Sequence, residues 1–228
     1  MECRRFLSWH DPVMRPETIA HLTSVLGWFL ATVAILTAWP QAIRLIRTRN
    51  SDGVNATTAG FACLSMIAWS GYTYRLGDTP ALISSVGPLA AWCTTLVMLV
   101  SLKAPDAVRT VLKITPVAVG LLLLSASSSW AWTGGIAAAG SALWALPQLR
   151  TALTVKRLEG VSIVSYTAMA AENVGWILYA ILTATPAYAA GASIQAPATA
   201  LIALKARRSR DRLVTMALHP SARVVAIS

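Results

Sequence analysis

The sequence AWPQAIRLIRTRNSDGV, residues 38–54, recurs in altered form as ALPQLRTALTVKRLEGV at residues 145–161. Each copy contains a Pro-Gln dipeptide, then a basic segment, then Gly-Val. When the chain is shifted against itself by 107 residues, more identical residues align without a gap. The aligned pairs are Pro40 with Pro147, Gln41 with Gln148, Gly53 with Gly160, Trp69 with Trp176 and Tyr72 with Tyr179. The chain therefore contains an internal repeat.

The composition is that of a membrane protein. Of the 228 residues, 56% are hydrophobic and 12% are charged, whereas about 25% is usual for the charged residues of soluble domains. Asp, Glu, Lys and Arg are absent from residues 18–43, 53–74, 79–102 and 114–149. A bilayer core of about 30 Å takes about 20 apolar residues per helix, so each of the first three runs predicts one crossing.

The longer apolar segments each divide into two helices. The run 114–149 exceeds one crossing, and serines and glycines between residues 125 and 135 separate helices near 107–127 and 130–151. The last apolar segment divides at Thr185-Pro186, where proline can open a helix, into helices near 161–183 and 186–204. The prediction is an all-α integral membrane protein with seven transmembrane helices.

Lysine and arginine set the predicted orientation. With the N-terminus outside, fifteen of these residues lie inside and four outside, as the positive-inside rule requires. We predict a bacterial inner membrane protein with the N-terminus out and the C-terminus in the cytoplasm. This bias also accounts for the net charge of +10. Nucleic-acid binding is not predicted, because the sequence has no basic segment with interleaved aromatic residues. Met1 and Met14 are both candidate starts, and a homo-oligomer is left open.

The helix between the two copies of the repeat keeps them in the same orientation. Without it, the basic loop of the second copy would face outward, against the positive-inside rule. We therefore predict two parallel three-helix bundles joined by a linker helix and related by an axis along the membrane normal. The predicted segments are an extracytoplasmic N-terminal segment (1–19), a first three-helix repeat (20–102), a linker helix (103–128), a second repeat (129–206) and a basic cytoplasmic tail (207–228).

The Pro-Gln dipeptides, each at the inner end of the first helix of a three-helix unit, resemble the PQ-loop superfamily. The layout of three, one and three helices over residues 20–206 is similar to the SWEET sugar transporters. The resemblance implies a small-solute, sugar-like transporter that works by alternating access, with a midplane site between the repeats. The sequence contains no Gly-x-x-x-x-Gly-Lys phosphate-binding loop, so we expect transport without ATP.

Each Pro-Gln dipeptide is a candidate hinge or gate. Pro40 and Pro147 lack an N–H group and leave a helix carbonyl without its partner, and Gln41 and Gln148 are placed to bond it or a neighbouring helix. The resemblance implies that the helices bend here to open and close an inner gate. A static kink is the alternative.

The second helix of each copy carries a stripe of candidate binding residues at i, i+4 and i+7. The two stripes are Ser65, Trp69 and Tyr72, and Glu172, Trp176 and Tyr179. This spacing puts each trio on one helical face. The resemblance implies that the two tryptophans stack on a sugar. Core packing is the alternative for the tryptophans, and an interfacial aromatic belt is the alternative for the tyrosines.

The third helix of each copy departs from the family pattern. SWEET sugar sites use an asparagine early in this helix, and no asparagine stands there in this sequence. The nearest polar candidates are Ser85 in the first copy and Ser193 and Gln195 in the second.

Glu172 is the acidic residue inside a predicted helix, next to Asn173. An ionisable group at that depth costs about 2.5–3.5 kcal/mol on insertion scales and usually faces a cavity or a partner. We predict that Glu172 and Asn173 bind a substrate hydroxyl or amine, or that Glu172 takes up a proton. The alternative is a protonated carboxyl bonded to a neighbouring helix.

Two other functions stay open. The motif EGVSI at residues 159–163 resembles cystinosin-like exporters, which suggests a proton-coupled exporter of an amino acid or related solute, although the coupling aspartate of that family aligns with Met169. The second open function is that of a ligand-binding seven-helix receptor that does not transport its ligand. We do not predict an enzyme, because the three histidines lie at or outside helix ends. The three cysteines include no CxxC pair, and no cofactor or metal is expected.

Overall fold

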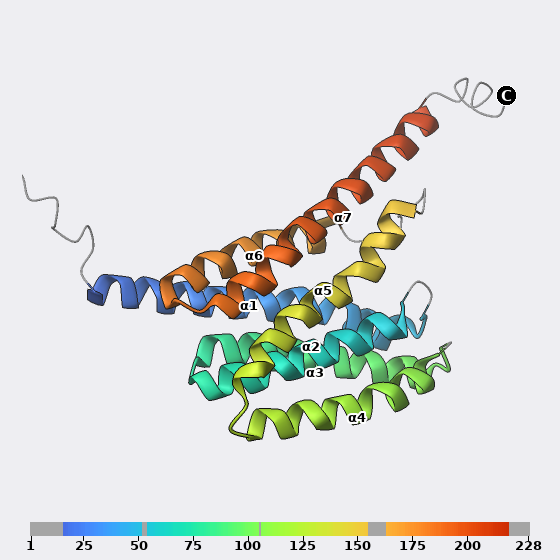
Figure 1. The fold of residues 1–228 in the computed structure, drawn as a ribbon. Coiled ribbons are helices and arrows are strands. Elements are labelled where there is room, and N and C mark those ends of the chain that lie inside the picture. Colours follow the sequence, from blue (N-terminus) through green and yellow to red (C-terminus); the bar gives the residue numbers. More distant parts are fainter. Residues whose placement is uncertain (1–15, 52–53, 105, 155–162, 219–228) are drawn as a thin grey trace, which may run out of the picture.

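The computed structural model describes residues 16–51, 54–104, 106–154 and 163–218, apart from the side chains at 16, 142, 147, 148, 151 and 210–218. Within these ranges the chain forms seven α-helices (Figure 1). They are α1 (Pro16–Thr48), α2 (Ala56–Leu76), α3 (Thr79–Ser101), α4 (Ala107–Ala126), α5 (Ala131–Thr154), α6 (Ile163–Thr183) and α7 (Pro186–Leu218). Their number and positions agree with the seven helices predicted from the sequence.

Capping residues explain the sharp ends of α2 and the start of α3. The Asn55 side chain accepts hydrogen bonds from the amides of Thr57 and Thr58, at 2.8 and 3.2 Å, and so starts α2. Gly77 ends α2 in the left-handed conformation, with φ at 70°, which glycine adopts without strain. Asp78 then caps α3 by accepting from the amide of Ala81 at 3.1 Å. A two-residue turn therefore fixes how α2 and α3 meet.

The helices alternate in direction along the bundle. Helices α1, α3, α5 and α7 run one way and α2, α4 and α6 the other (Figure 1). We call the end that holds the α2–α3, α4–α5 and α6–α7 turns the turn end, and the opposite end the basic end. Helices α5 and α7 diverge from α1, α2 and α3 toward the basic end (Figure 1).

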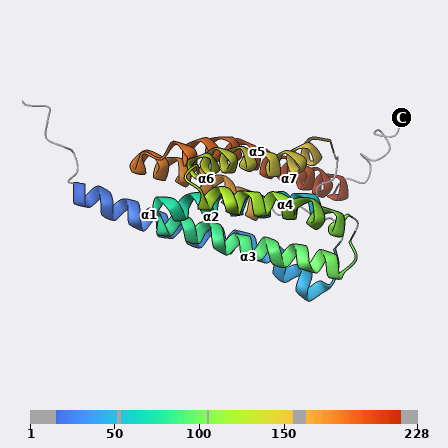
Figure 2. The same ribbon diagram turned by 60° about the horizontal axis from the view of Figure 1, so that its bottom comes forward.

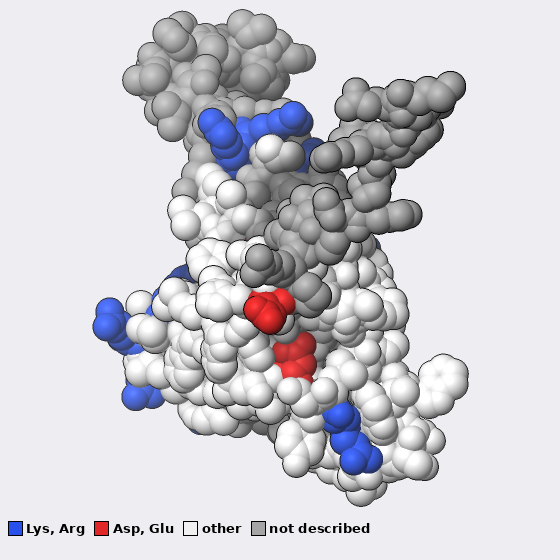
Figure 3. Space-filling model, turned by 90° about the vertical axis from the view of Figure 1, so that its left-hand side faces the viewer, with Lys and Arg blue, Asp and Glu red and all other residues white. Residues whose placement is uncertain are grey.

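Charge differs between the two ends. The described lysines and arginines at the basic end are Arg44, Arg47, Arg49, Lys103, Arg109, Lys113, Arg150, Lys205, Arg207 and Arg208. Within the described ranges, the turn end carries Arg75 and the acidic Glu17 and Asp78. Seen from the turn end, acidic side chains lie near the middle of the face and basic ones toward its margins (Figure 3). This segregation is what the sequence-based orientation requires, and the orientation itself stays a prediction.

The two halves pack in the same way internally. Helix α3 contacts both α1 and α2, and α7 likewise contacts both α5 and α6. Between the halves, α2 contacts α5 and α1 contacts α6, so the second helix of each copy meets the first helix of the other. Helix α4 packs mainly on α2, with smaller contacts to α3 and α5 (Figures 1 and 2). This is the contact pattern of an approximate two-fold axis.

Glycines allow the halves to approach closely, in a pair related by the repeat. A Cβ atom on Gly27 of α1 would lie 2.9 Å from Cε2 of Tyr179 in α6. A Cβ atom on Gly134 of α5 would lie 2.6 Å from Cε2 of Tyr72 in α2. Gly27 and Gly134 are 107 residues apart, as are Tyr72 and Tyr179. The same glycine–tyrosine contact thus occurs twice, as is typical of small residues at membrane helix interfaces.

The outer surface is suited to lipid. Large apolar side chains such as Phe29, Leu112 and Leu123 are at least 63% exposed. Helices α1, α3, α4 and α7 are each long and apolar enough to cross a membrane. Helix α6 also carries polar groups that face the interior, Glu172 and Asn173. The chain is an integral membrane protein with several apolar spans.

Candidate functional site

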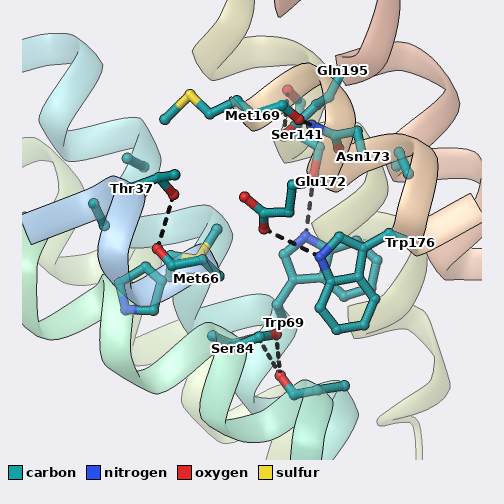
Figure 4. A pocket seen from close by; sticks show the side chains of 18 of the residues that line it. Thr37, Met66, Trp69, Ser84, Ser141, Met169, Glu172, Asn173, Trp176 and Gln195 are labelled. Atoms are coloured by element: carbon teal, nitrogen blue, oxygen red, sulfur yellow. Dashed lines mark hydrogen bonds between the residues drawn. The ribbon is translucent and has the colours of Figure 1, made fainter. Parts of the chain in front are cut away.

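A cavity of about 130 Å³ lies between the two halves, midway along the helices. Every helix except α4 contributes to its wall. Figure 4 shows side chains from both halves pointing into this space. The predicted site residues that line the cavity are Trp69, Ser85, Glu172, Asn173, Trp176 and Gln195.

Glu172 supplies the acidic group of the cavity. Its carboxylate extends from α6 toward Thr37 of α1 (Figure 4). Oε1 accepts a hydrogen bond of 3.2 Å from the indole nitrogen of Trp176, one turn further along α6. The Thr37 hydroxyl donates to the carbonyl of Ala34, at 3.1 Å. Among the residues that the structure describes, no lysine, arginine or histidine lines the cavity, so none of them pairs with this carboxylate there.

Trp69 is held in place by the opposite half. Its indole nitrogen donates to the hydroxyl of Ser141 in α5, at 3.1 Å. Gln195 of α7 donates to the carbonyl of the same serine, at 3.2 Å. Gly191 makes room for the ring, because a Cβ atom there would lie 2.9 Å from Cζ2 of Trp69. These contacts join α2, α5 and α7 beside the cavity.

Tyr188 of α7 completes an aromatic wall with the two tryptophans. Its ring centroid lies 5.6 Å from that of Trp69 and 5.8 Å from that of Trp176. These separations are in the range of favourable aromatic pairs. Tyr188 is buried, at 4% exposure, and its ring lines the cavity. We call Trp69, Trp176 and Tyr188 the aromatic wall.

Toward the turn end, next to the cavity, a carboxylate bonds two tyrosines, and we call these three residues the Asp78 cluster. Tyr179 donates its hydroxyl to both carboxylate oxygens of Asp78, at 3.0 and 3.1 Å. Tyr188 donates to Oδ2, at 2.9 Å. Hydrogen bonds to an ionised carboxylate are stronger than neutral ones. The α2–α3 turn of the first half is thereby fastened to α6 and α7 of the second.

Four predicted stripe and third-helix residues lie outside the cavity wall. Ser65 is buried against Gly140 of α5, and its hydroxyl has no partner within the described residues. Ser193 is exposed on α7. The ring of Tyr72 contacts those of Trp69, Trp130 and Tyr188. Tyr179 belongs to the Asp78 cluster. Ser65 lies on a face of α2 that packs against α5, and Ser193 lies on the surface of α7. Neither residue therefore reaches the cavity.

The predicted hinge residues lie at the basic side of the cavity. Helix α1 continues through Pro40 to Thr48, with Pro40 exposed and Gln41 half-buried. Pro147 and Gln148 fall within α5, and their side chains lie outside the described residues. The hinge role therefore stays a prediction.

Three functional candidates were missed by the sequence analysis: Asp78, Tyr188 and Trp144. Asp78 precedes Thr79-Pro80, a helix-start pattern that signals a cap but not a partner across the bundle. Tyr188 lies outside the repeated stripe. Trp144 lines the cavity with its ring, and its buried indole nitrogen has no partner among the described residues. It is a donor available to an oxygen atom of a bound solute.

Comparison with known proteins identifies the architecture. No protein-family model matches the chain, and no curated protein matches it in sequence. Among solved structures, a eukaryotic SWEET transporter determined at 3.7 Å resolution superposes on it with a TM-score of 0.67. The match covers 86% of this chain and 98% of that one. The chain has the SWEET transporter fold. Because the two sequences are only 10% identical, this likeness concerns the fold alone.

Proposed function

We propose that the chain is a membrane transporter that carries a small polar solute by alternating access, without ATP. The observation that supports this most is the cavity shared by the repeats, with Trp69 from the first half and Trp176 and Glu172 from the second. A site at the interface of two repeats opens to one side or the other when the repeats move against each other. In this proposal two parallel three-helix bundles enclose the site, and α4 is the linker between them.

The structure fits the state of this cycle that is closed at the turn end. The Asp78 cluster joins the halves there, while α5 and α7 diverge from α1, α2 and α3 toward the basic end (Figure 1). Solute would enter this state from the basic end, which the sequence predicts to be cytoplasmic. Release at the turn end requires the hydrogen bonds to Asp78 to break, with bending at Pro40 and Pro147 as the proposed hinge motion.

A sugar-like solute is the candidate that the resemblance to SWEET transporters implies. The faces of Trp69 and Trp176 suit the C–H groups of a sugar ring, and Trp144 offers an N–H donor. Ser84 and Ser85 donate to the carbonyl of Ala81, at 2.8 and 3.0 Å, and their hydroxyl oxygens retain acceptor capacity.

Glu172 supports a second candidate, a proton-coupled carrier of an amino acid or related cation. A carboxylate without a protein cation in a membrane cavity can bind a substrate amine or a proton. In this candidate Asn173 and Gln195 supply polar contacts beside it.

Counterflow in proteoliposomes tests the proposal. Liposomes preloaded with unlabelled sugars, amino acids or amines should take up the labelled form of one of them transiently. A uniporter's flux should not respond to an imposed pH gradient, whereas a proton-coupled carrier should be driven by it and should lose that response in Glu172→Gln. Equilibrium binding without counterflow of any bound solute would reject transport and favour a receptor.

A further inference from the structure

The cavity contains a carboxyl group with no basic side chain beside it among the described residues. Glu172 is the carboxylic acid of its wall, and no lysine, arginine or histidine lines it within the described part of the chain. The carboxyl group accepts a hydrogen bond from Trp176, at 3.2 Å. A charge in a low-dielectric site is costly unless it is paired. A positively charged ligand would supply the missing partner.

The aromatic wall beside this carboxylate presents rings rather than free donors. Trp69 donates its N–H to Ser141, at 3.1 Å, and Trp176 donates its N–H to Glu172. Tyr188 donates its O–H to Asp78, at 2.9 Å. With these groups engaged, the wall offers π-electron density to the cavity. Rings of tryptophan and tyrosine grouped around a site are the usual means of binding an organic ammonium ion.

A second carboxylate, that of Asp78, increases the negative potential at the turn end of the cavity. Asp78 lies behind Tyr188 and accepts its hydroxyl hydrogen. Within the described residues, no basic side chain forms an ion pair with Asp78 or Glu172. Arg75, at the turn end, donates instead to the carbonyls of Ala126 and Ser127, at 3.4 and 2.9 Å. The aromatic wall therefore lies between two acids.

The cavity has room for a small ligand. Its volume is about 130 Å³, close to the roughly 150 Å³ of an engineered cavity that binds benzene. A compact ammonium ion therefore fits between the carboxyl group and the aromatic wall.

We propose that the cavity selects a small organic ammonium ion, whose charge pairs with Glu172 while its alkyl groups contact Trp69, Trp176 and Tyr188. The inference rests on the proposed function in taking this cavity as the solute site, and it names the substrate class. It favours a cation over the sugar-like solute that the resemblance implies, because the described residues of the wall include no basic side chain and the N–H and O–H groups of Trp69, Trp176 and Tyr188 are engaged within the protein.

Equilibrium binding to the purified full-length chain in lipid nanodiscs tests the proposal. The probes are choline, tetramethylammonium and 3,3-dimethylbutan-1-ol, a neutral molecule with the shape of choline. We expect choline to bind at least roughly tenfold more tightly than the neutral analogue, since cation–π contacts and a carboxylate act on the charge alone. Glu172→Gln should weaken choline binding roughly tenfold or more and leave the neutral analogue unchanged.

Matched controls separate the site from the general charge of the protein. Glu17→Gln removes an exposed carboxylate at the turn end, outside the cavity, and should bind choline as the wild type does. Circular dichroism and size-exclusion profiles should show that both variants fold. Equal affinity for choline and its neutral analogue, undiminished choline binding in Glu172→Gln, or no binding of either cation would overturn the proposal.

The same preparations distinguish failure of this inference from failure of the proposed function. Choline binding without counterflow would support the cation site and reject transport. Counterflow of a sugar with no choline binding would support transport and reject the cation site.

Discussion

Removing the hydroxyl groups of Tyr179 and Tyr188 should open the turn end of the bundle. The double variant Tyr179→Phe/Tyr188→Phe keeps both rings, so the packing of Tyr179 on Gly27 and the ring contacts of Tyr188 are preserved. It also keeps Asp78, whose cap on α3 would be lost in an alanine variant. The perturbation is therefore confined to the hydrogen bonds that join the two halves.

The size of the effect follows from the bonds removed. Each tyrosine donates to a carboxylate at 2.9–3.1 Å, and a hydrogen bond to a charged group contributes about 1.5–3 kcal/mol. Asp78 is half-buried, so the lower value is appropriate. Each single variant should raise the ratio of open to closed molecules roughly tenfold, and the double variant roughly a hundredfold.

Electron–electron distance measurements can read this equilibrium directly. Spin labels at Leu76 of α2 and Ile181 of α6, both exposed, report on the separation of the halves in a background without native cysteines. The double variant should gain a population at longer distance. Tyr72→Phe is the matched control, since Tyr72 is the repeat counterpart of Tyr179 and its hydroxyl does not bond to Asp78. An unchanged distance distribution in the double variant, or equal opening in the control, would refute the reasoning.

Two further predictions concern packing and the hinge. Gly134→Ala should lower thermal stability measurably, because its Cβ would lie 2.6 Å from the ring of Tyr72, whereas Gly135→Ala, with nothing within 4 Å, should not; a thermal-shift assay that ranks them the other way would contradict the interface. Pro40→Ala together with Pro147→Ala should slow counterflow while leaving the protein folded by circular dichroism, and full transport in that variant would remove the hinge proposal.

Features that both halves share could be predicted from the sequence. The charge-free runs located the helices, since crossing a bilayer requires long apolar segments. The repeat at 107 residues related Trp69 to Trp176, and both line one cavity. Periodicity placed Glu172 on the same face as Trp176, and the two side chains are hydrogen-bonded.

Features that break the symmetry could not be predicted in this way. The counterpart of Asp78 in the second half is Thr185, and that of Tyr188 is Ala81, so the repeat marks neither member of the Asp78 cluster. Their contact spans 110 residues and depends on how the halves tilt against each other. Ser65 occupies the position equivalent to Glu172 but packs against α5, where the halves lie closer together. Sequence spacing describes one helix face and carries no information on which interface is open.

Access to the cavity from the two sides of the membrane tests the central claim most directly. A cysteine in place of Ser84, which lines the cavity, can be labelled with a membrane-impermeant thiol reagent in sealed vesicles of either orientation, in a background without native cysteines. We expect labelling from the basic end in the wild-type background, and from both ends in the Tyr179→Phe/Tyr188→Phe background. Labelling from the turn end alone, or from neither side in both backgrounds, would contradict a shared chamber that opens alternately to the two faces.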